Sequence, residues 1–234
     1  MTTAQLFIGS VLRLGDEGQF SAIHKNRVNG PIVIGEEGLV GDAQADQRVH
    51  GGPEKAVHHY AAENYVHLAS RFPAITAELI PGSIGENIST SGWDEQGVFI
   101  GDVFQLGSAL LQVSQPRSPC WKIDHRYATK GLARLIAETG LTGWYYRVLE
   151  PGIAASGDPF ELLARLPEAV SLAELWQVWA EHRPDLETLA RLAVAPGLNP
   201  AWAKKLHDRL EWLRVNTNKQ TVPVPTFHVK PTGQ

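Results

Sequence analysis

Hydrophobic and polar positions in the first two thirds of the chain follow the short alternations typical of β-strands. Each run spans only a few residues, and Gly, Pro or Asp bounds most of them. The pattern predicts strands over Gln5–Leu12, Ala22–Lys25, Pro31–Ile34, Ala56–Tyr60, Val98–Ile100, Val103–Leu106 and Ala109–Ser114, with Tyr145–Leu149 and Phe160–Arg165 as returning strands. Many short strands with few helices favour a barrel or a sandwich over a parallel doubly wound sheet.

Two segments among these strands have helical spacing instead. One helix is expected over Ala62–Arg71, because Pro73 follows and ends it. The second is expected over Leu132–Thr139, where Gly140 stands in the usual position of a C-cap.

From about Ser171 the apolar positions recur at helical intervals. Ser171 and Glu174 form a capping box at the start of one helix, and Pro184-Asp185 ends it and starts a second. Asn199 caps a third helix with Pro200 at its first position. The pattern predicts a compact three-helix unit whose Trp and Leu stripes form its core.

Composition places the chain among soluble globular proteins. It has 234 residues, 43% hydrophobic and 20% charged, and a formal net charge of −4, so no overall basic field attracts nucleic acid. The N-terminus lacks a basic region followed by an apolar stretch, and no apolar run reaches the roughly 18 residues of a membrane span. With one cysteine in the whole sequence, we expect a cytoplasmic protein without membrane partners.

Cys120 is that single cysteine, and it lies in the run Gln115-Pro116-Arg117-Ser118-Pro119-Cys120-Trp121-Lys122. A lone thiol forms no internal disulfide and cannot ligate an iron–sulfur cluster by itself. It is therefore a buried bystander, a nucleophile, or one soft ligand to a metal held mostly by another group.

A second dense segment surrounds a Gly-Gly-Pro turn. It holds Arg48, His50, Gly51, Gly52, Lys55, His58 and His59 within twelve residues. Glycines allow the backbone to approach a ligand, and Arg and Lys offer donors suited to phosphate. In a strand, His58 and His59 point to opposite faces, so only one of them faces a given pocket.

Three kinds of chemistry fit these residues. Zinc would take Cys120 with His50, His58 or His59, but the spacing is not that of a zinc finger. A cysteine hydrolase would pair Cys120 with His59 or His125 as base. A metal held by a cofactor would need only one soft protein ligand, with donors for the cofactor's phosphate and ring.

Four motifs in order resemble the MOSC-domain family, in particular the bacterial YiiM group. They are Arg48–Tyr60, Pro81–Asn87, Gly101-Asp102 and Val113–Lys122. The resemblance covers about residues 5–166, and the helical unit resembles the "3-alpha" domain that often follows. It implies a mainly β protein with helices: a β-barrel-like MOSC domain over residues 1–167 and a small three-helix domain over 168–215. We expect the tail, residues 216–234, to be poorly ordered.

The resemblance also implies a function. Proteins of this family bind molybdenum cofactor, a pyranopterin dithiolene (molybdopterin) that carries molybdenum and a terminal phosphate. They reduce N-hydroxylated compounds such as 6-N-hydroxylaminopurine, which detoxifies base analogues. The sequence has neither a GxGxxG fingerprint nor cluster ligands, so we expect an external flavin or iron–sulfur electron donor. The three-helix unit is a candidate docking site for that donor or for a second subunit. A non-enzymatic carrier of sulfur or of the cofactor on Cys120 remains the alternative.

The resemblance assigns Cys120 as the thiolate on molybdenum. Arg117 and Ser118 are expected to hold a cofactor oxygen or phosphate, together with Lys25, Arg27 and the Gly-Gly-Pro segment described above. Glu86 and Asn87 are expected to contact pterin nitrogens or substrate. His59 or His125 is expected to donate a proton, because histidine titrates near neutral pH.

Overall fold

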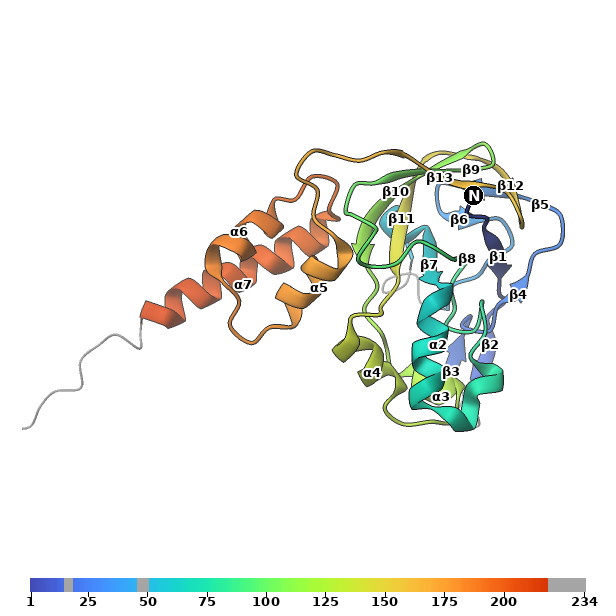
Figure 1. Ribbon diagram of the computed structural model, residues 1–234, viewed down its shortest axis with the longest axis horizontal. Helices are drawn as coiled ribbons and strands as arrows, with labels where there is room; N and C mark the ends of the chain where they lie inside the picture. The colour runs from blue at the N-terminus through green and yellow to red at the C-terminus, as the bar shows by residue number, and fades with distance from the viewer. Residues whose placement is uncertain (15–18, 46–50, 219–234) are drawn as a thin grey trace, which may run out of the picture.

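The computed structural model describes residues 1–14, 19–45 and 51–218. Its main sheet has eight strands in the order β13-β9-β10-β11-β7-β8-β1-β4, and only β7 and β8 run parallel. A three-stranded sheet, β12-β5-β6, and the β2–β3 hairpin complete the strands (Figure 1). Their bounds are β1 Gln5–Ile8, β2 Leu12–Leu14, β3 Gln19–Ser21, β4 Asn26–Arg27, β5 Pro31–Gly35, β6 Gly38–Leu39, β7 Val57–Ala61, β8 Ile88–Thr90, β9 Val103–Leu106, β10 Ala109–Pro116, β11 Trp144–Glu150, β12 Gly152–Ala155 and β13 Phe160–Ala164.

The main sheet does not close into a barrel among the described residues. No ladder joins β13 to β4, the two ends of the sheet order. The segment before β1 does reach the segment before β13 through an isolated bridge between Thr3 and Pro159, and Phe160 N–H donates to Thr2 O at 2.9 Å. The fold is therefore a mixed sheet with helices and without a closed barrel among the described residues, which corrects the expectation of a barrel-like domain.

Two predicted strands are wrong. Ala22–Lys25 forms no strand: this segment joins β3 to β4, and its Lys25 side chain binds Asp42. Val98–Ile100 makes only the isolated bridge of Phe99 with Ser171. The other predicted strands are confirmed within a few residues, although Gln5–Leu12 divides into β1 and the start of β2.

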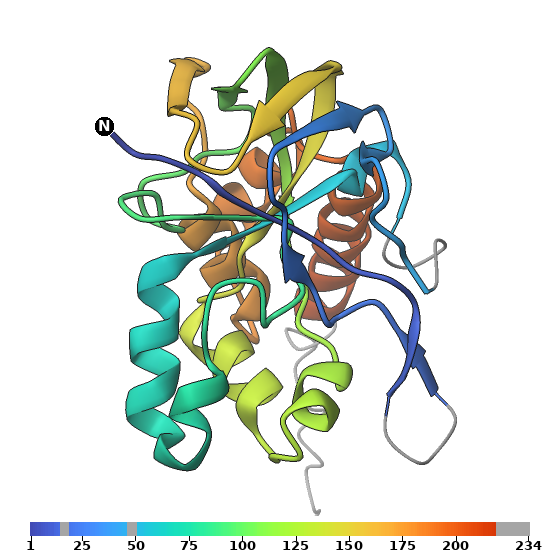
Figure 2. The ribbon, with the colours of Figure 1, turned by 90° about the vertical axis from the view of Figure 1, so that its right-hand side faces the viewer.

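Helices α2 (Ala62–Arg71), α3 (Lys122–Arg126) and α4 (Leu132–Thr139) lie together below the strands (Figure 2). The bounds predicted for α2 and α4 are confirmed, and Gly140 caps α4 at φ 75°. The pattern missed α3 and the short 3-10 helices η1 (Pro53–Lys55) and η2 (Pro73–Glu78). Side chains of α2, α3 and α4 share a second hydrophobic core with Tyr60 and Ile84.

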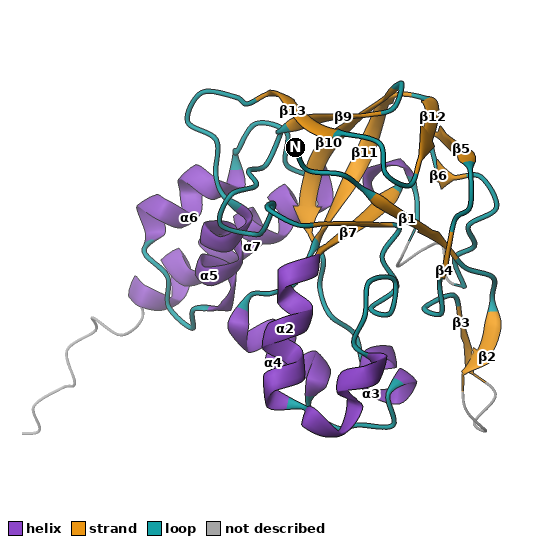
Figure 3. Cartoon of the chain, turned by 45° about the vertical axis from the view of Figure 1, so that its right-hand side comes forward, coloured by secondary structure: helices purple, strands orange, loops and turns teal. Residues whose placement is uncertain are grey.

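Helices α5 (Leu172–Ala180), α6 (Leu186–Ala193) and α7 (Pro200–Asn218) pack beside the sheet (Figure 3). The N-cap at Ser171 is confirmed, since Ser171 Oγ accepts from Glu174 N–H at 3.1 Å, whereas the Glu174 side chain pairs with Arg191 and does not complete the predicted capping box. Their buried residues belong to the same hydrophobic cluster as those of the sheet. The division into domains at residues 167 and 168 therefore remains a proposal.

The expected tail begins inside a helix. Residues 216–218 continue α7, and residues 219–234 lie outside the described part of the chain. In the described segments, no helix has the length and apolar character needed to cross a bilayer.

Candidate functional site

A cleft lies beside β7 and β11, where four loop segments meet. It encloses about 590 Å³ of empty space, counting the part open to solvent. The lining residues are Ser21, Ala22, Ile23, Lys25, Asp42, Ala43, Gln44, Ala45, Lys55, His58, Ile84, Gly85, Asn87, Arg117, Cys120, Lys122 and Tyr145. The cleft thus brings the only cysteine together with one histidine and several cations.

Strand alternation decides which histidine of β7 faces this cleft. His58 pairs with Tyr145 of β11, and His59 pairs with Trp144. His58 and Tyr145 line the cleft, whereas His59 and Trp144 face the core, because neighbouring residues of a strand point to opposite faces.

His59 is fully buried and fully bonded. Its ring nitrogens lie 3.0 Å from Tyr146 Oη and 2.9 Å from Thr90 Oγ1, and its ring stacks on Trp144 at 4.3 Å. Burial lowers the pKa of His59 to about 3, so the ring is neutral at physiological pH. The expectations that His59 binds the cofactor and donates a proton are corrected by this placement.

His58 is buried in the wall of the cleft. Its backbone N–H donates to Asn87 Oδ1 at 3.1 Å, and its ring hydrogen-bonds to the Gly85 backbone. Burial, followed by the charge of Arg117, holds the pKa of His58 well below its usual value. Nε2 of this neutral ring has no hydrogen-bond partner among the described residues.

Arg117 is 6% exposed and enters the cleft from the end of β10. Its backbone N–H donates to Gly143 O at 3.0 Å, and Nη2 donates to Ile84 O at 3.4 Å. Nη1 is buried without a hydrogen-bond partner, and no described carboxylate forms an ion pair with the guanidinium. A buried cation without an ion-pair partner is costly to the empty protein.

Cys120 lies three residues after Arg117 and lines the same cleft, partly exposed and with a free thiol. Its backbone oxygen accepts from Ile123 N–H at 3.1 Å, which joins the loop to α3. The thiol is therefore accessible and close to positive charge, and it is not sealed in the core.

Lys25 and Asp42 form a buried ion pair in the cleft. Lys25 Nζ lies 2.6 Å from both carboxylate oxygens, and Asp42 also accepts from Gly9 N–H at 2.7 Å and from Asn87 Nδ2 at 2.8 Å. Burial lowers the pKa of Lys25 in spite of Asp42. Lys25 and Asn87 line the cleft as expected, but their polar groups already hold its loops.

Glu86 lies outside the cleft. Its carboxylate accepts from Tyr65 Oη at 2.5 Å, Gly82 N–H at 2.5 Å and Ile84 N–H at 3.2 Å, and it is fully buried. The expectation that Glu86 contacts pterin or substrate is therefore corrected: it shapes the turn that leads to Asn87.

Lys55 lines the cleft from η1. Glu54 fixes this helix through an ion pair with Arg147 of β11 at 2.5 Å, and Glu54 O accepts from Ser114 Oγ at 2.6 Å. Gly52 opens η1 at φ 87°, and a Cβ there would meet nothing within 4 Å. Gly52 lines a neighbouring groove with residues 35–44.

The remaining expected residues do not line the cleft. Arg27 is exposed on β4, Ser118 is exposed in the loop before Cys120, and His125 lies on α3 with its ring edge-on to Trp121. Gly51 precedes Gly52 outside the lining, and Arg48 and His50 lie outside the described residues. Asp42, Lys122 and Tyr145 line the cleft without having been predicted as site residues. Lys122 carried a signal, because it ends the fourth motif quoted above, whereas the pairing of Tyr145 with His58 is visible only in the structure.

A protein-only metal centre finds no support. Within residues 1–14, 19–45 and 51–218, no group of three His, Cys, Asp or Glu side chains is placed to hold an ion. Since His58 and His59 face opposite sides of β7, they do not join Cys120 in a zinc site.

Known proteins resemble this chain over most of its length. The MOSC domain model matches residues 46–161. Protein YiiM of Escherichia coli (strain K12) is 40% identical over 82% of this chain and 86% of that protein. A protein named "Reductase" from Gibberella moniliformis (strain M3125 / FGSC 7600) is 34% identical over 75% of this chain, which spans only 31% of that protein.

A solved structure agrees with the sequence comparison. The crystal structure of YiiM from Escherichia coli superposes with a TM-score of 0.76 and 32% identity, covering 90% of this chain and 92% of that chain. The chain therefore belongs to the MOSC family and is a relative of YiiM.

Proposed function

We propose that the cleft binds molybdenum cofactor and that the protein is an oxidoreductase of N-hydroxylated compounds such as 6-N-hydroxylaminopurine. The observation that carries the proposal is the buried guanidinium of Arg117, whose Nη1 lacks a partner in the same cleft as the thiol of Cys120. An anionic group with a soft metal satisfies both side chains at once.

The residues present fit this cofactor. Cys120 offers a soft thiolate for molybdenum, and Arg117 offers donors for a phosphate or a ring oxygen. His58 offers a neutral ring with an unpartnered Nε2, which suits an N–H donor of a pterin or a base. Lys55 and Lys122 add positive charge along the same wall.

The bound cofactor would supply a metal centre that accepts the hydroxyl oxygen of the substrate. In the overall reaction the N–O bond breaks, two electrons and two protons enter, and an amine and water leave. The chain's own task is to orient the substrate beside Cys120 and to deliver the protons.

Proton delivery is proposed for His125. Of the two histidines expected as donors, His125 lies on the helix that follows Cys120, whereas His59 lies in the core. Electrons must come from outside the chain, since the sequence has no motif for a flavin, a nicotinamide or a cluster. A flavin or iron–sulfur protein is the proposed donor, and α5–α7 are a proposed place for it.

The test is a molybdenum and pterin analysis of the full chain produced in a host that makes the cofactor. We expect molybdenum in proportion to protein in the wild type, loss of molybdenum in Cys120→Ser, and loss of both molybdenum and pterin in Arg117→Met. Arg27→Met is the matched control, because Arg27 is an exposed arginine outside the cleft. The molybdenum and pterin content of Arg27→Met should equal that of the wild type.

A second arm separates enzyme from carrier. Loaded protein is given 6-N-hydroxylaminopurine and a reduced viologen dye, and adenine formation is followed. We expect turnover that slows in His125→Gln. Cofactor binding without turnover would favour the carrier on Cys120, and zinc in place of molybdenum would overturn the proposal.

A further inference from the structure

Glu95 is a buried carboxylate outside the cleft that the proposed chemistry does not use. It is 4% exposed and lies in the loop between β8 and β9. No described Lys, Arg or His forms an ion pair with it. Its backbone oxygen accepts from Ala173 N–H, in the first turn of α5, at 2.8 Å.

Besides the N–H of Glu95 itself, Gly143 and Asn64 donate to this carboxylate. Oε1 accepts from Gly143 N–H at 2.7 Å, and Asn64 Nδ2 of α2 lies 3.0 and 3.3 Å from the two oxygens. Glu95 thereby joins α2 and α5 to the turn that enters β11.

Gly143 connects this carboxylate to the cleft. Its carbonyl accepts from Arg117 N–H at 3.0 Å, so the same residue bonds Glu95 through its N–H and Arg117 through its C=O. A Cβ on Gly143 would lie 2.4 Å from His59 O and 3.1 Å from His58 Nε2, at a φ of +68°. The Gly143 backbone is therefore packed directly against the cleft histidine.

We propose that Glu95 is a positioning residue for the cleft, because its carboxylate fixes the Gly143 backbone and this backbone sets Arg117 and His58. The proposal concerns the geometry of the apoprotein and does not rest on the proposed cofactor.

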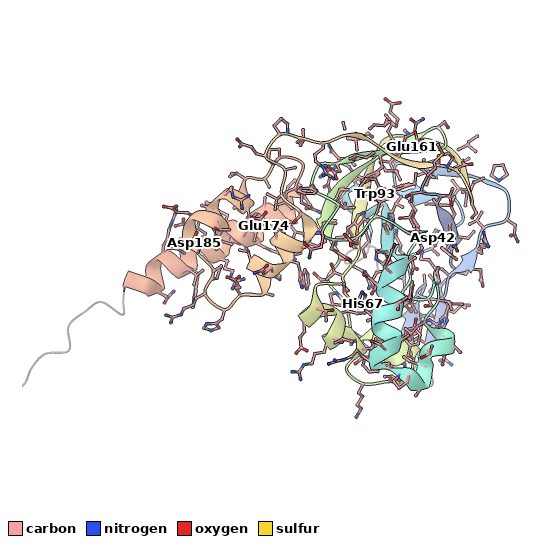
Figure 4. All side chains as sticks on the ribbon, in the orientation of Figure 1. Asp42, His67, Trp93, Glu161, Glu174 and Asp185 are labelled. Atoms are coloured by element: carbon pink, nitrogen blue, oxygen red, sulfur yellow. The ribbon has the colours of Figure 1, made fainter. Side chains whose placement is uncertain are left out.

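The protonation of Glu95 provides the means to test this role. Burial raises the pKa of Glu95 to about 7. The titratable groups that face it are Asp94 of its own loop, Tyr60 of β7, and Glu63, His67 and Glu174 along the groove outside it. Figure 4 labels His67 and Glu174.

Protonation of Glu95 weakens its hydrogen bond with Gly143 N–H. Hydrogen bonds to a charged carboxylate are roughly twice as strong as those to a neutral one. Below its pKa, Glu95 therefore holds Gly143 less firmly, and the Gly143 and Arg117 amides exchange with solvent more readily. We expect about a tenfold loss of protection, corresponding to about 1.4 kcal/mol in the hydrogen bond.

The experiment is an NMR titration of the full chain from pH 5.5 to 8.5, with amide exchange corrected for its intrinsic pH dependence. We expect the Gly143 amide shift and the protection of Arg117 to change together with one midpoint near 7. Glu95→Gln keeps the shape without the charge, so both changes should disappear. Glu63→Gln is the control, since Glu63 lines the same groove as Glu95 but accepts from Gly92 N–H, at 2.6 Å, instead of Gly143.

Two outcomes would overturn the proposal. One is a Gly143 shift that titrates while Arg117 protection stays constant, since Glu95 would then hold only its own turn. The other is a titration that persists in Glu95→Gln. Binding of inorganic phosphate is measured separately at pH 8, where Glu95→Gln should bind three- to tenfold more weakly than the wild type. If the wild type binds no phosphate, the anion site of the proposed function fails while the amide titration still decides the role of Glu95.

Discussion

Replacing Arg117 with Met is expected to make the ligand-free protein more stable. A buried donor without a partner costs about 1–3 kcal/mol, and an unmatched buried charge adds to this. The substitution forfeits the bond to Ile84 O, which at 3.4 Å is long, and the hydrogen bond with the Tyr145 side chain; each contributes about 0.5–1 kcal/mol. Met fills much of the same volume.

The net gain is therefore about 1 kcal/mol. In a chain of this length each kcal/mol raises the melting temperature by about 2–4 °C, so Arg117→Met should melt roughly 3 °C above the wild type. The assay is thermal unfolding in a phosphate-free buffer. Arg27→Met should stay within about 1 °C of the wild type, because Arg27 is exposed.

A second measurement, with added phosphate, tests whether Arg117 binds an anion. It should raise the melting temperature of the wild type and leave that of Arg117→Met unchanged, because a ligand that binds only the folded state stabilises it. A variant that melts below the wild type would refute the reasoning. Arg117 would then be a structural residue, and the main support for an anion site would be lost.

Two further predictions concern the scaffold. Burial lowers the pKa of His59 from 6.5 to about 3. Below pH 6.5 the unfolded chain therefore binds a proton at this residue that the folded protein does not bind. The free energy of unfolding falls as the pH drops from 6.5 to about 3, by at most about 5 kcal/mol. His59→Gln should flatten this part of the profile in urea unfolding at pH 5 and pH 8, and an unchanged slope would contradict the assignment. In the same assay, Gly82→Ala should lower the free energy of unfolding by about 1–3 kcal/mol more than Gly157→Ala. Both glycines have a positive φ, but only a Cβ at position 82 would meet the Phe7 ring, at 2.6 Å. Equal losses would mean that the Phe7 ring moves aside.

The sequence predicts the local elements of this fold better than their assembly. The bounds of α2 and α4 follow from apolar spacing, Pro73 and Gly140, which are all local signals. The segment Ala22–Lys25 reads as a strand from its own residues, yet it lies outside the sheet because Lys25 is held by Asp42, seventeen positions away. A contact between such distant positions cannot be predicted from the residues of the segment itself.

The same limit applies to the candidate site. Alternation along β7 shows that His58 and His59 face opposite ways, but only the pairing with β11 decides which one faces the cleft. Glu86 follows a Gly-rich turn and resembles an exposed ligand in the sequence. Its role depends on Tyr65, which α2 brings close from a distant part of the chain.

The cleft is positive although the chain as a whole is negative, and the placement of the acids explains why. The Asp42 carboxylate accepts hydrogen bonds from Lys25, Gly9 and Asn87. Glu86 and Glu95 each accept from backbone N–H groups and one side chain, in the turns that Arg117 also touches. Glu86 acts on Arg117 electrostatically without forming an ion pair.

Each nearby carboxylate is thus committed to shaping a loop, and none satisfies Arg117 Nη1. A fold selected for stability alone would turn one of these acids toward the guanidinium. Leaving the cation unmatched lowers the stability of the empty protein, and under the proposed function it raises the affinity for the anionic cofactor. For this reason the melting temperature of Arg117→Met and its cofactor content should move in opposite directions.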